Sequence, residues 1–83
     1  YCFINCSCNI GHHAIIGECS SVMSNSSISG HCEIGTHNYI GTNVNFIPNI
    51  KTVKNIRIGV GSVVIKDLKK EGTYFGVPVK KIV

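Results

Sequence analysis

Two adjacent histidines, His12 and His13, are the side chains of this sequence best suited to proton transfer. They stand in the segment NIGHHAIIGE, residues 9–18, and the chain has only four histidines. A neutral imidazole titrates near physiological pH, so it can take a proton from an attacking amine or hydroxyl. The alternative is that both are exposed strand residues without a chemical role, and for His13 we favour that alternative.

Positive charge is confined to the C-terminal part of the chain. Residues 1–50 carry two glutamates and no Lys or Arg, whereas residues 51–83 carry all eight basic residues and two acidic ones. Such a segment suits a polyanionic ligand such as a nucleotide or coenzyme, and a solvated tail that keeps the domain soluble is the alternative. Because no aromatic residues alternate with the basic ones, we expect no nucleic-acid partner.

The length and composition of the chain restrict its domain count, its assembly and its location. A chain of 83 residues makes one domain with a thin core, so we expect oligomerisation or a missing segment. No apolar run is long enough to span a membrane and no signal-peptide pattern occurs, so we expect no membrane partner and a cytoplasmic location. The sequence starts with Tyr1 rather than Met, which is typical of a fragment or a trimmed chain.

The cysteines predict free thiols rather than a metal centre. There are five, an odd number, and no C-x-x-C pair occurs. In a reducing compartment such residues pack as small hydrophobic side chains. Cys6 and Cys8 do not have the spacing of a zinc ribbon, and we expect no bound metal.

A repeat of six residues must position all of these groups. Ten of the eleven residues at a spacing of six are apolar. These positions are Ile4, Ile10, Ile16, Val22, Ile28, Ile34, Ile40, Phe46, Thr52, Ile58 and Val64. Neither a helix nor an alternating strand has this period, and an unbroken spacing makes a sandwich of short strands a poor alternative.

The repeat predicts an all-β fold, a parallel β-helix with triangular coils of about 18 residues. The apolar residue and a small residue four places later are expected to point inward. Glycine often follows the apolar residue, where the corner needs positive φ or close approach of backbones. Residues 1–68 would form about four coils and residues 69–83 a C-terminal cap, either a strand or a short helix. We expect an interruption near residues 46–59, where Thr52 takes an inward position and Pro48 fits a corner.

The 18-residue coil also predicts which histidines meet. His13 and His31 are 18 residues apart, so they should stack on neighbouring coils, and His37 lies one face further round. Three histidines can hold zinc, so a zinc site remains an alternative.

Two segments resemble a known superfamily. With the hexapeptide repeats, GVGSVVIKD at 59–67 and GVPVKKI at 76–82 are similar to the left-handed β-helix acyltransferases, although Val79 replaces the usual alanine. INCSCNIGHHAIIGECSSV resembles the nucleotide-sugar acetyltransferases, which include the UDP-4-amino-sugar N-acetyltransferase of bacillosamine synthesis and the sialic acid O-acetyltransferase group. Carbonic anhydrases of this fold bind zinc through three histidines, but the 13, 31, 37 spacing does not copy theirs.

The resemblance implies roles for particular residues. His12 matches the family's general base, and Asn5 and His13 are expected on the acceptor side, with His13 standing where the family often has an acidic residue. His13 should point away from His12 along an outer strand. Coenzyme contacts are expected at Ser21, Gly30, Thr42, Val60, Lys66, Pro78, Lys80 and Lys81.

The resemblance further implies a substrate and an assembly. It predicts acetyl transfer from acetyl-CoA to an amino or hydroxyl group of a sugar, with sites between the subunits of a homotrimer. The family's N-terminal nucleotide-sugar-binding domain is absent from this sequence. An inactive or structural β-helix is the alternative function.

Overall fold

The computed structural model describes residues 2–83, and Tyr1, the first residue of the predicted β-helix, lies outside the described residues. All regular structure in residues 2–83 is β-strand, as predicted. The strands are β1 (Cys2–Ile4), β2 (Asn9–Ile10), β3 (Ile15–Ile16), β4 (Ser20–Val22), β5 (Ser27–Ile28), β6 (Glu33–Ile34), β7 (Tyr39–Ile40), β8 (Asn45–Phe46), β9 (Ile56–Ile58), β10 (Val63–Val64), β11 (Gly72–Gly76) and β12 (Val79–Lys81). Since these residues contain no helix, they contain none that could cross a membrane.

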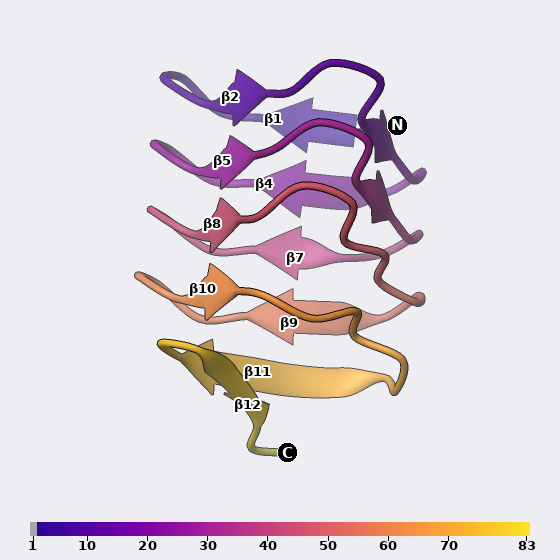
Figure 1. The fold of residues 1–83 in the computed structure, drawn as a ribbon, viewed down its shortest axis with the longest axis vertical. Coiled ribbons are helices and arrows are strands. Elements are labelled where there is room, and N and C mark those ends of the chain that lie inside the picture. The colour runs from indigo at the N-terminus through magenta and orange to yellow at the C-terminus, as the bar shows by residue number, and fades with distance from the viewer. Residues whose placement is uncertain (1) are drawn as a thin grey trace.

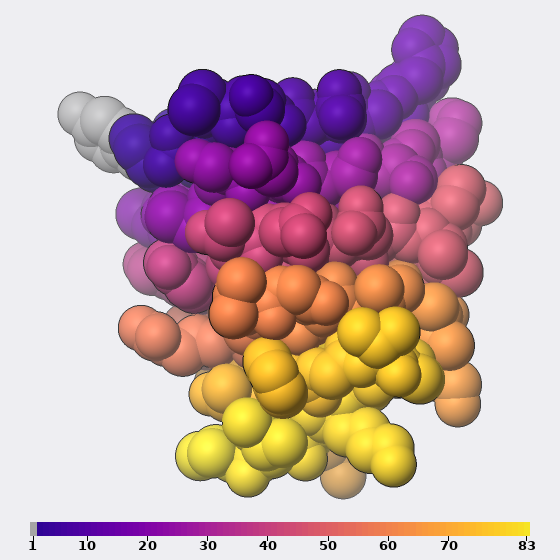
Figure 2. Space-filling view, turned by 90° about the vertical axis from the view of Figure 1, so that its left-hand side faces the viewer, coloured from indigo at the N-terminus to yellow at the C-terminus, as the bar shows by residue number. Residues whose placement is uncertain are grey.

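The strands form three sheets that enclose a triangular prism (Figure 1). Their orders are β1-β4-β7-β9-β11-β12, β2-β5-β8-β10 and β3-β6. Strands of neighbouring coils pair in parallel, for example Cys2 with Ser20, at a separation of 18 residues. Each coil therefore lies directly on the one before it, and the space-filling view shows the coils as successive layers (Figure 2).

Two side chains of each hexapeptide fill the prism. The apolar positions from Val22 to Val64 are buried, including Thr52, and so are the positions four residues later from Ser20 onward. Polar residues at the second position bond to the next coil: Ser20 Oγ donates to the Gly35 carbonyl at 2.8 Å and Ser26 Oγ to the Gly41 carbonyl at 2.7 Å. Within residues 2–83, no buried side-chain nitrogen or oxygen lacks a hydrogen-bond partner.

The corners bend at a residue that the sequence did not identify. Nine residues that are not glycine have φ between 53° and 65°, and they recur every six positions from Ser7 to Asn55. Gly61 continues the series at φ 73°. The repeat glycines, by contrast, are required by close approach, because a Cβ on Gly17 would lie 2.6 Å from the backbone carbon of Gly35.

The predicted interruption near residues 46–59 is wrong. Ile50, Thr52 and Ile56 all point inward, and Glu33 and Lys51 form a parallel bridge that continues the third face. The polar Thr52 fits because its hydroxyl donates to Asn38 Oδ1 and accepts from the Gly35 N–H. Pro48 lies in a turn, where its missing N–H disrupts no ladder.

The two ends of the prism differ. β11 pairs in parallel with β9 and then turns back to pair antiparallel with β12, so residues 69–83 add a hairpin and no helix. The first coil has no strand above it among the described residues. Ile4 and Ile10, expected in the core, are consequently 45% and 37% exposed.

Candidate functional site

The prism has three corners at which side chains point outward in columns. The first corner comprises residues 6–7, 24–25, 42–43 and 60–61, and its turns are stacked at the left of Figure 1. The second comprises 12–13, 30–31, 48–49 and 66–67, and the third 18–19, 36–37 and 54–55. Members of a column are 18 residues apart, so they lie on successive coils about 4.8 Å apart.

His12 and His13 occupy the turn of the first coil at the second corner. Both side chains are exposed, which agrees with their predicted place outside the core. The expectation that His13 points away along an outer strand is wrong. Its left-handed backbone, φ 60°, directs the ring toward His12, and the two ring centroids are 3.9 Å apart at an interplanar angle of 83°.

His31 lies on the coil below and stacks on His13, as the 18-residue spacing predicted. The centroids of these two rings are 5.1 Å apart and the rings are nearly parallel, at 8°. His37 lies at the third corner instead. Among residues 2–83, no group of three or more His, Cys, Asp or Glu side chains is arranged to hold a metal ion.

Gly30 contributes a free backbone N–H to the same corner. Its neighbour His31 donates its N–H to the His12 carbonyl at 2.9 Å, which fixes the two coils against each other. The Gly30 N–H itself has no acceptor in the part of the chain that the structure describes. A side chain at position 30 would be crowded, because a Cβ there would lie 3.1 Å from the His12 carbonyl oxygen.

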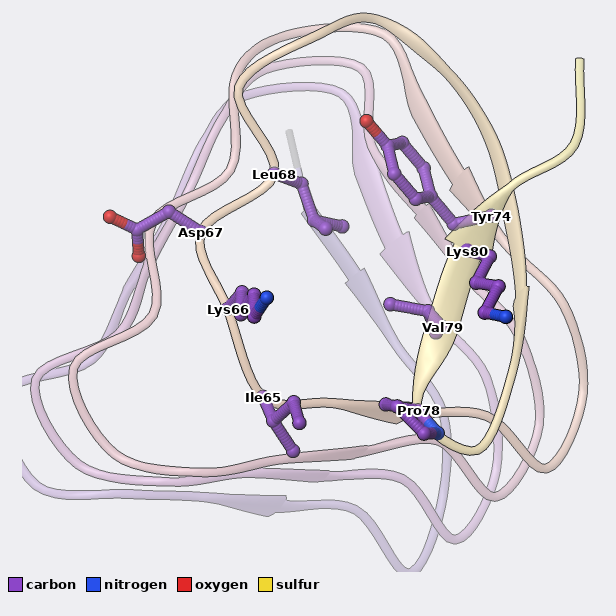
Figure 3. A pocket seen from close by; sticks show the side chains of 8 residues that line it. All are labelled: Ile65, Lys66, Asp67, Leu68, Tyr74, Pro78, Val79 and Lys80. Carbon is purple, nitrogen blue, oxygen red and sulfur yellow. The ribbon is translucent and has the colours of Figure 1, made fainter.

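A cavity of about 310 Å³ lies where the second corner meets the C-terminal hairpin (Figure 3). Its lining residues are Ile65, Lys66, Asp67, Leu68, Tyr74, Pro78, Val79 and Lys80. Tyr74 is held in this wall because its hydroxyl donates to the Lys70 carbonyl at 2.8 Å. The cavity thus has an apolar wall, with Lys66 and Asp67 on one side, and the Lys80 side chain points away from it on the outer side of β12 (Figure 3). The cationic Lys66 beside an apolar wall suits an organic anion.

A second depression of about 480 Å³ continues from this cavity up the second corner. The two share Ile65, Lys66 and Asp67, and the second reaches Pro48 and Asn49 one coil above. Since Lys66 is three coils below His12, the two side chains are about 14 Å apart along the axis at the usual strand spacing. From the first coil to the last, this corner therefore carries the His12 imidazole, the free Gly30 N–H and the cavity lined by Lys66.

The structure brings together some of the residues expected from the sequence and separates others. His12, His13, Gly30 and Lys66 share the second corner, and Pro78 and Lys80 join Lys66 at its cavity. The remaining expected residues lie elsewhere in the chain. Asn5, Thr42 and Val60 are at or beside the first corner, Ser21 is on the outer side of β4, and Lys81 donates from Nζ to the Val83 carbonyl at 3.1 Å.

Asn5 is further committed to its own turn. Its Oδ1 accepts the N–H of Cys6 at 2.8 Å, so the side chain caps the first corner. It does not reach His12 within one chain.

Two parts of this site were not among the residues that sequence reasoning assigned to it. His31 was expected to stack on His13 and was considered only as a ligand in the alternative of a zinc site. Its 18-residue offset from His13 was the available signal. Tyr74, which forms part of the apolar wall, has no motif of its own, because the hairpin that carries it has no repeat.

Comparison with solved structures defines the class of fold as the left-handed β-helix of hexapeptide repeats. LpxA from Acinetobacter baumannii superposes with a TM-score of 0.93 and 25% identity, over 98% of this chain and 31% of that one. A serine acetyltransferase (CysE) from Neisseria gonorrhoeae has a TM-score of 0.61 and 28% identity, over 99% and 38%. The acetyltransferase domain of PglB from Neisseria gonorrhoeae has a TM-score of 0.62 and 17% identity, over 98% and 54%.

These matches concern parts of larger molecules. This chain spans between 31% and 54% of the three chains. No protein-family model and no curated protein sequence matches it.

Proposed function

We propose that this chain is an acyltransferase that moves the acetyl group of acetyl-CoA to an amino or hydroxyl group of a sugar. One observation carries the proposal: His12, the Gly30 N–H and the Lys66 cavity lie in order along one corner. The similarity of the fold to solved acetyltransferases, including a serine acetyltransferase at 28% identity, supports the same class of reaction.

His12 is the general base in this proposal. Its imidazole takes the proton from the attacking nitrogen or oxygen as that atom bonds to the thioester carbon. The carbon–sulfur bond then breaks, and the proton passes from His12 to the departing coenzyme thiolate. In this proposal the transfer is direct and forms no acyl-enzyme.

The negative charge that develops on the thioester oxygen needs a donor. The Gly30 N–H is free and lies one coil below His12, so it is our candidate. A Cβ at position 30 would lie 3.1 Å from the His12 carbonyl oxygen, so the Gly30 backbone lies beside the turn that carries the base. A preorganised donor of this kind contributes about 3–4 kcal/mol to transition-state stabilisation in enzymes where it has been removed.

The coenzyme would extend down the second corner from His12 to the C-terminal cavity. Lys66 would then meet its phosphates, Lys80 would add to the positive field beside the cavity, and the apolar wall would suit its adenine ring. Lys81 is further from this path and contributes only to the general positive field. Residues 1–50, with two glutamates and no Lys or Arg, leave the acceptor end without competing cations.

A homotrimer completes the site. Thr42 and Val60 lie at the first corner, whereas His12 and Lys66 are at the second. If the first corner of one subunit faces the second corner of the next, all these residues line a single groove. The acceptor, which by resemblance is a nucleotide sugar, would bind at the His12 end of that groove beside the neighbouring subunit's Asn5.

Acetyl transfer to a panel of UDP-amino sugars and sialic acid, followed by chromatography, tests this function. We expect His12→Asn to lower the rate by about 10²–10⁴, the usual effect of losing a general base, while calorimetry shows unchanged acetyl-CoA binding. His37→Asn is the matched control, because it makes the same exchange in a turn at another corner. Equal rates for His12→Asn and the parent would contradict the assignment of the base. A chain that binds no acetyl-CoA would instead favour a structural β-helix.

A further inference from the structure

The three imidazoles at the second corner are held by one another. His12 meets His13 edge to face, and His13 stacks on His31. None of the three rings makes a side-chain hydrogen bond to any residue from 2 to 83. A general base is ordinarily oriented by a hydrogen-bonded carboxylate or carbonyl, and here ring packing is the contact that orients it.

The backbone fixes the direction of two of these rings. His13 has φ 60° and His31 has φ 61°, so both leave the corner with the same geometry one coil apart. The His31 N–H donates to the His12 carbonyl at 2.9 Å, which sets the spacing of the two turns. A parallel stack at 8° follows from this repetition.

We propose that His31 is a positioning residue that orients the general base His12 through the ring of His13. The proposal rests on the function proposed above. His31 restricts rotation of the His13 ring, and the edge-on contact then restricts rotation of the His12 ring. Because the His12 ring is then already restricted before the reaction, it loses less side-chain entropy when it reaches the geometry for attack.

The role requires the aromatic ring of His31 and not its charge. His31→Asn removes the ring and keeps a residue that accepts the left-handed backbone, as Asn49 and Asn55 do in this chain. His31→Phe keeps a ring that can stack but cannot titrate. His37→Asn is the matched control, because His37 has φ 53° and makes no ring contact with the three imidazoles.

NMR of the imidazole Cε1–H and Cδ2–H groups in the full chain tests the positioning without turnover. We expect His31→Asn to move the His13 resonances by loss of the ring current and the His12 resonances through the freed His13 ring. His31→Phe should keep both sets displaced from random-coil values, and His37→Asn should leave both at parent positions. Unmoved His12 and His13 resonances in His31→Asn would overturn the positioning.

Kinetics then test whether the positioning serves catalysis. We expect His31→Asn to lower kcat roughly tenfold with little change in KM for acetyl-CoA, since a misplaced group costs rate without removing the base. His31→Phe should recover most of that loss. Parent kcat in His31→Asn, despite moved resonances, would overturn the catalytic role. Parent activity in His12→Asn would separately refute the proposed base, and the NMR result would still stand.

Discussion

Replacing Asn38 by leucine tests whether the polar groups inside the prism stabilise it. Asn38 is 1% exposed and makes three side-chain hydrogen bonds. Its Nδ2 donates to the Thr36 carbonyl at 3.0 Å and the Val53 carbonyl at 2.9 Å, and its Oδ1 accepts from the Thr52 hydroxyl. Leucine has a similar volume and is more apolar, so a purely hydrophobic account predicts a more stable chain.

The hydrogen-bond partners of Asn38 that leucine leaves unsatisfied instead predict a less stable chain. Without Asn38 the Val53 carbonyl has no donor in residues 2–83, and the Thr52 hydroxyl loses its acceptor. Each such orphan costs about 1–3 kcal/mol, whereas the Thr36 carbonyl keeps the N–H of Asn55. Burying leucine returns about 1.5–3 kcal/mol. The net result is a free energy of unfolding lowered by about 2 kcal/mol.

Thermal unfolding followed by circular dichroism, at equal chain concentrations, measures this change. A loss of 2 kcal/mol corresponds to a Tm lower by about 8–16 °C in a domain of this size. Asn45→Leu is the control, because Asn45 lies exposed on the outer face of β8 and should change the free energy of unfolding by less than about 0.5 kcal/mol. A Tm for Asn38→Leu equal to or above that of the parent would refute the reasoning.

Three further predictions follow from particular contacts. Gly17→Ala should lower the free energy of unfolding by about 1–3 kcal/mol, since its Cβ would meet the Gly35 carbonyl group at 2.6–2.7 Å. Gly61→Asn should be nearly neutral, because asparagine adopts the same backbone conformation at other corners. Similar chemical-denaturation midpoints for the two variants would contradict this account of the corners. A thiol reagent should label Cys2, Cys6 and Cys19 rapidly in the folded chain and Cys32 only on unfolding, as mass spectrometry of the labelled peptides would show; fast labelling of Cys32 would mean that the coils open. Acetyl-CoA affinity, measured by calorimetry, should fall as salt rises and should fall further in Lys66→Ala/Lys80→Ala than in Lys54→Ala/Lys81→Ala, because only the first pair lines the cavity. Equal losses in the two double variants would place the phosphates elsewhere.

The six-residue period contained most of the fold. It identified the inward positions, the 18-residue coil and the stacking of His13 on His31, because a parallel ladder places identical phases of the repeat directly above one another. Thr52 led to the wrong prediction, since its residue type alone does not show that Asn38 lies within the prism and accepts the hydrogen bond of its hydroxyl. Such a partner is fixed by the coil and not by the local sequence.

Corner conformations and ring orientations were less accessible to sequence reasoning. Glycine is the usual sign of positive φ, yet here the left-handed position is held by serine, cysteine, histidine and asparagine. The repeat glycines serve close approach instead. The contact between His12 and His13 depends on that unexpected backbone, and the C-terminal cavity depends on a hairpin outside the repeat.

Because every coil repeats the same 18 positions, the number of coils sets the distance between two groups that lie at the same corner. Inserting 18 residues between two coils would preserve every corner and every inward position, and would lengthen the distance from His12 to Lys66 by about 4.8 Å. Inserting six would rotate all later residues by one face and carry Lys66 away from the histidine corner. The number of whole coils between these two groups therefore determines the length of a ligand that can span them. Evolution could change that length in discrete steps without redesigning either end.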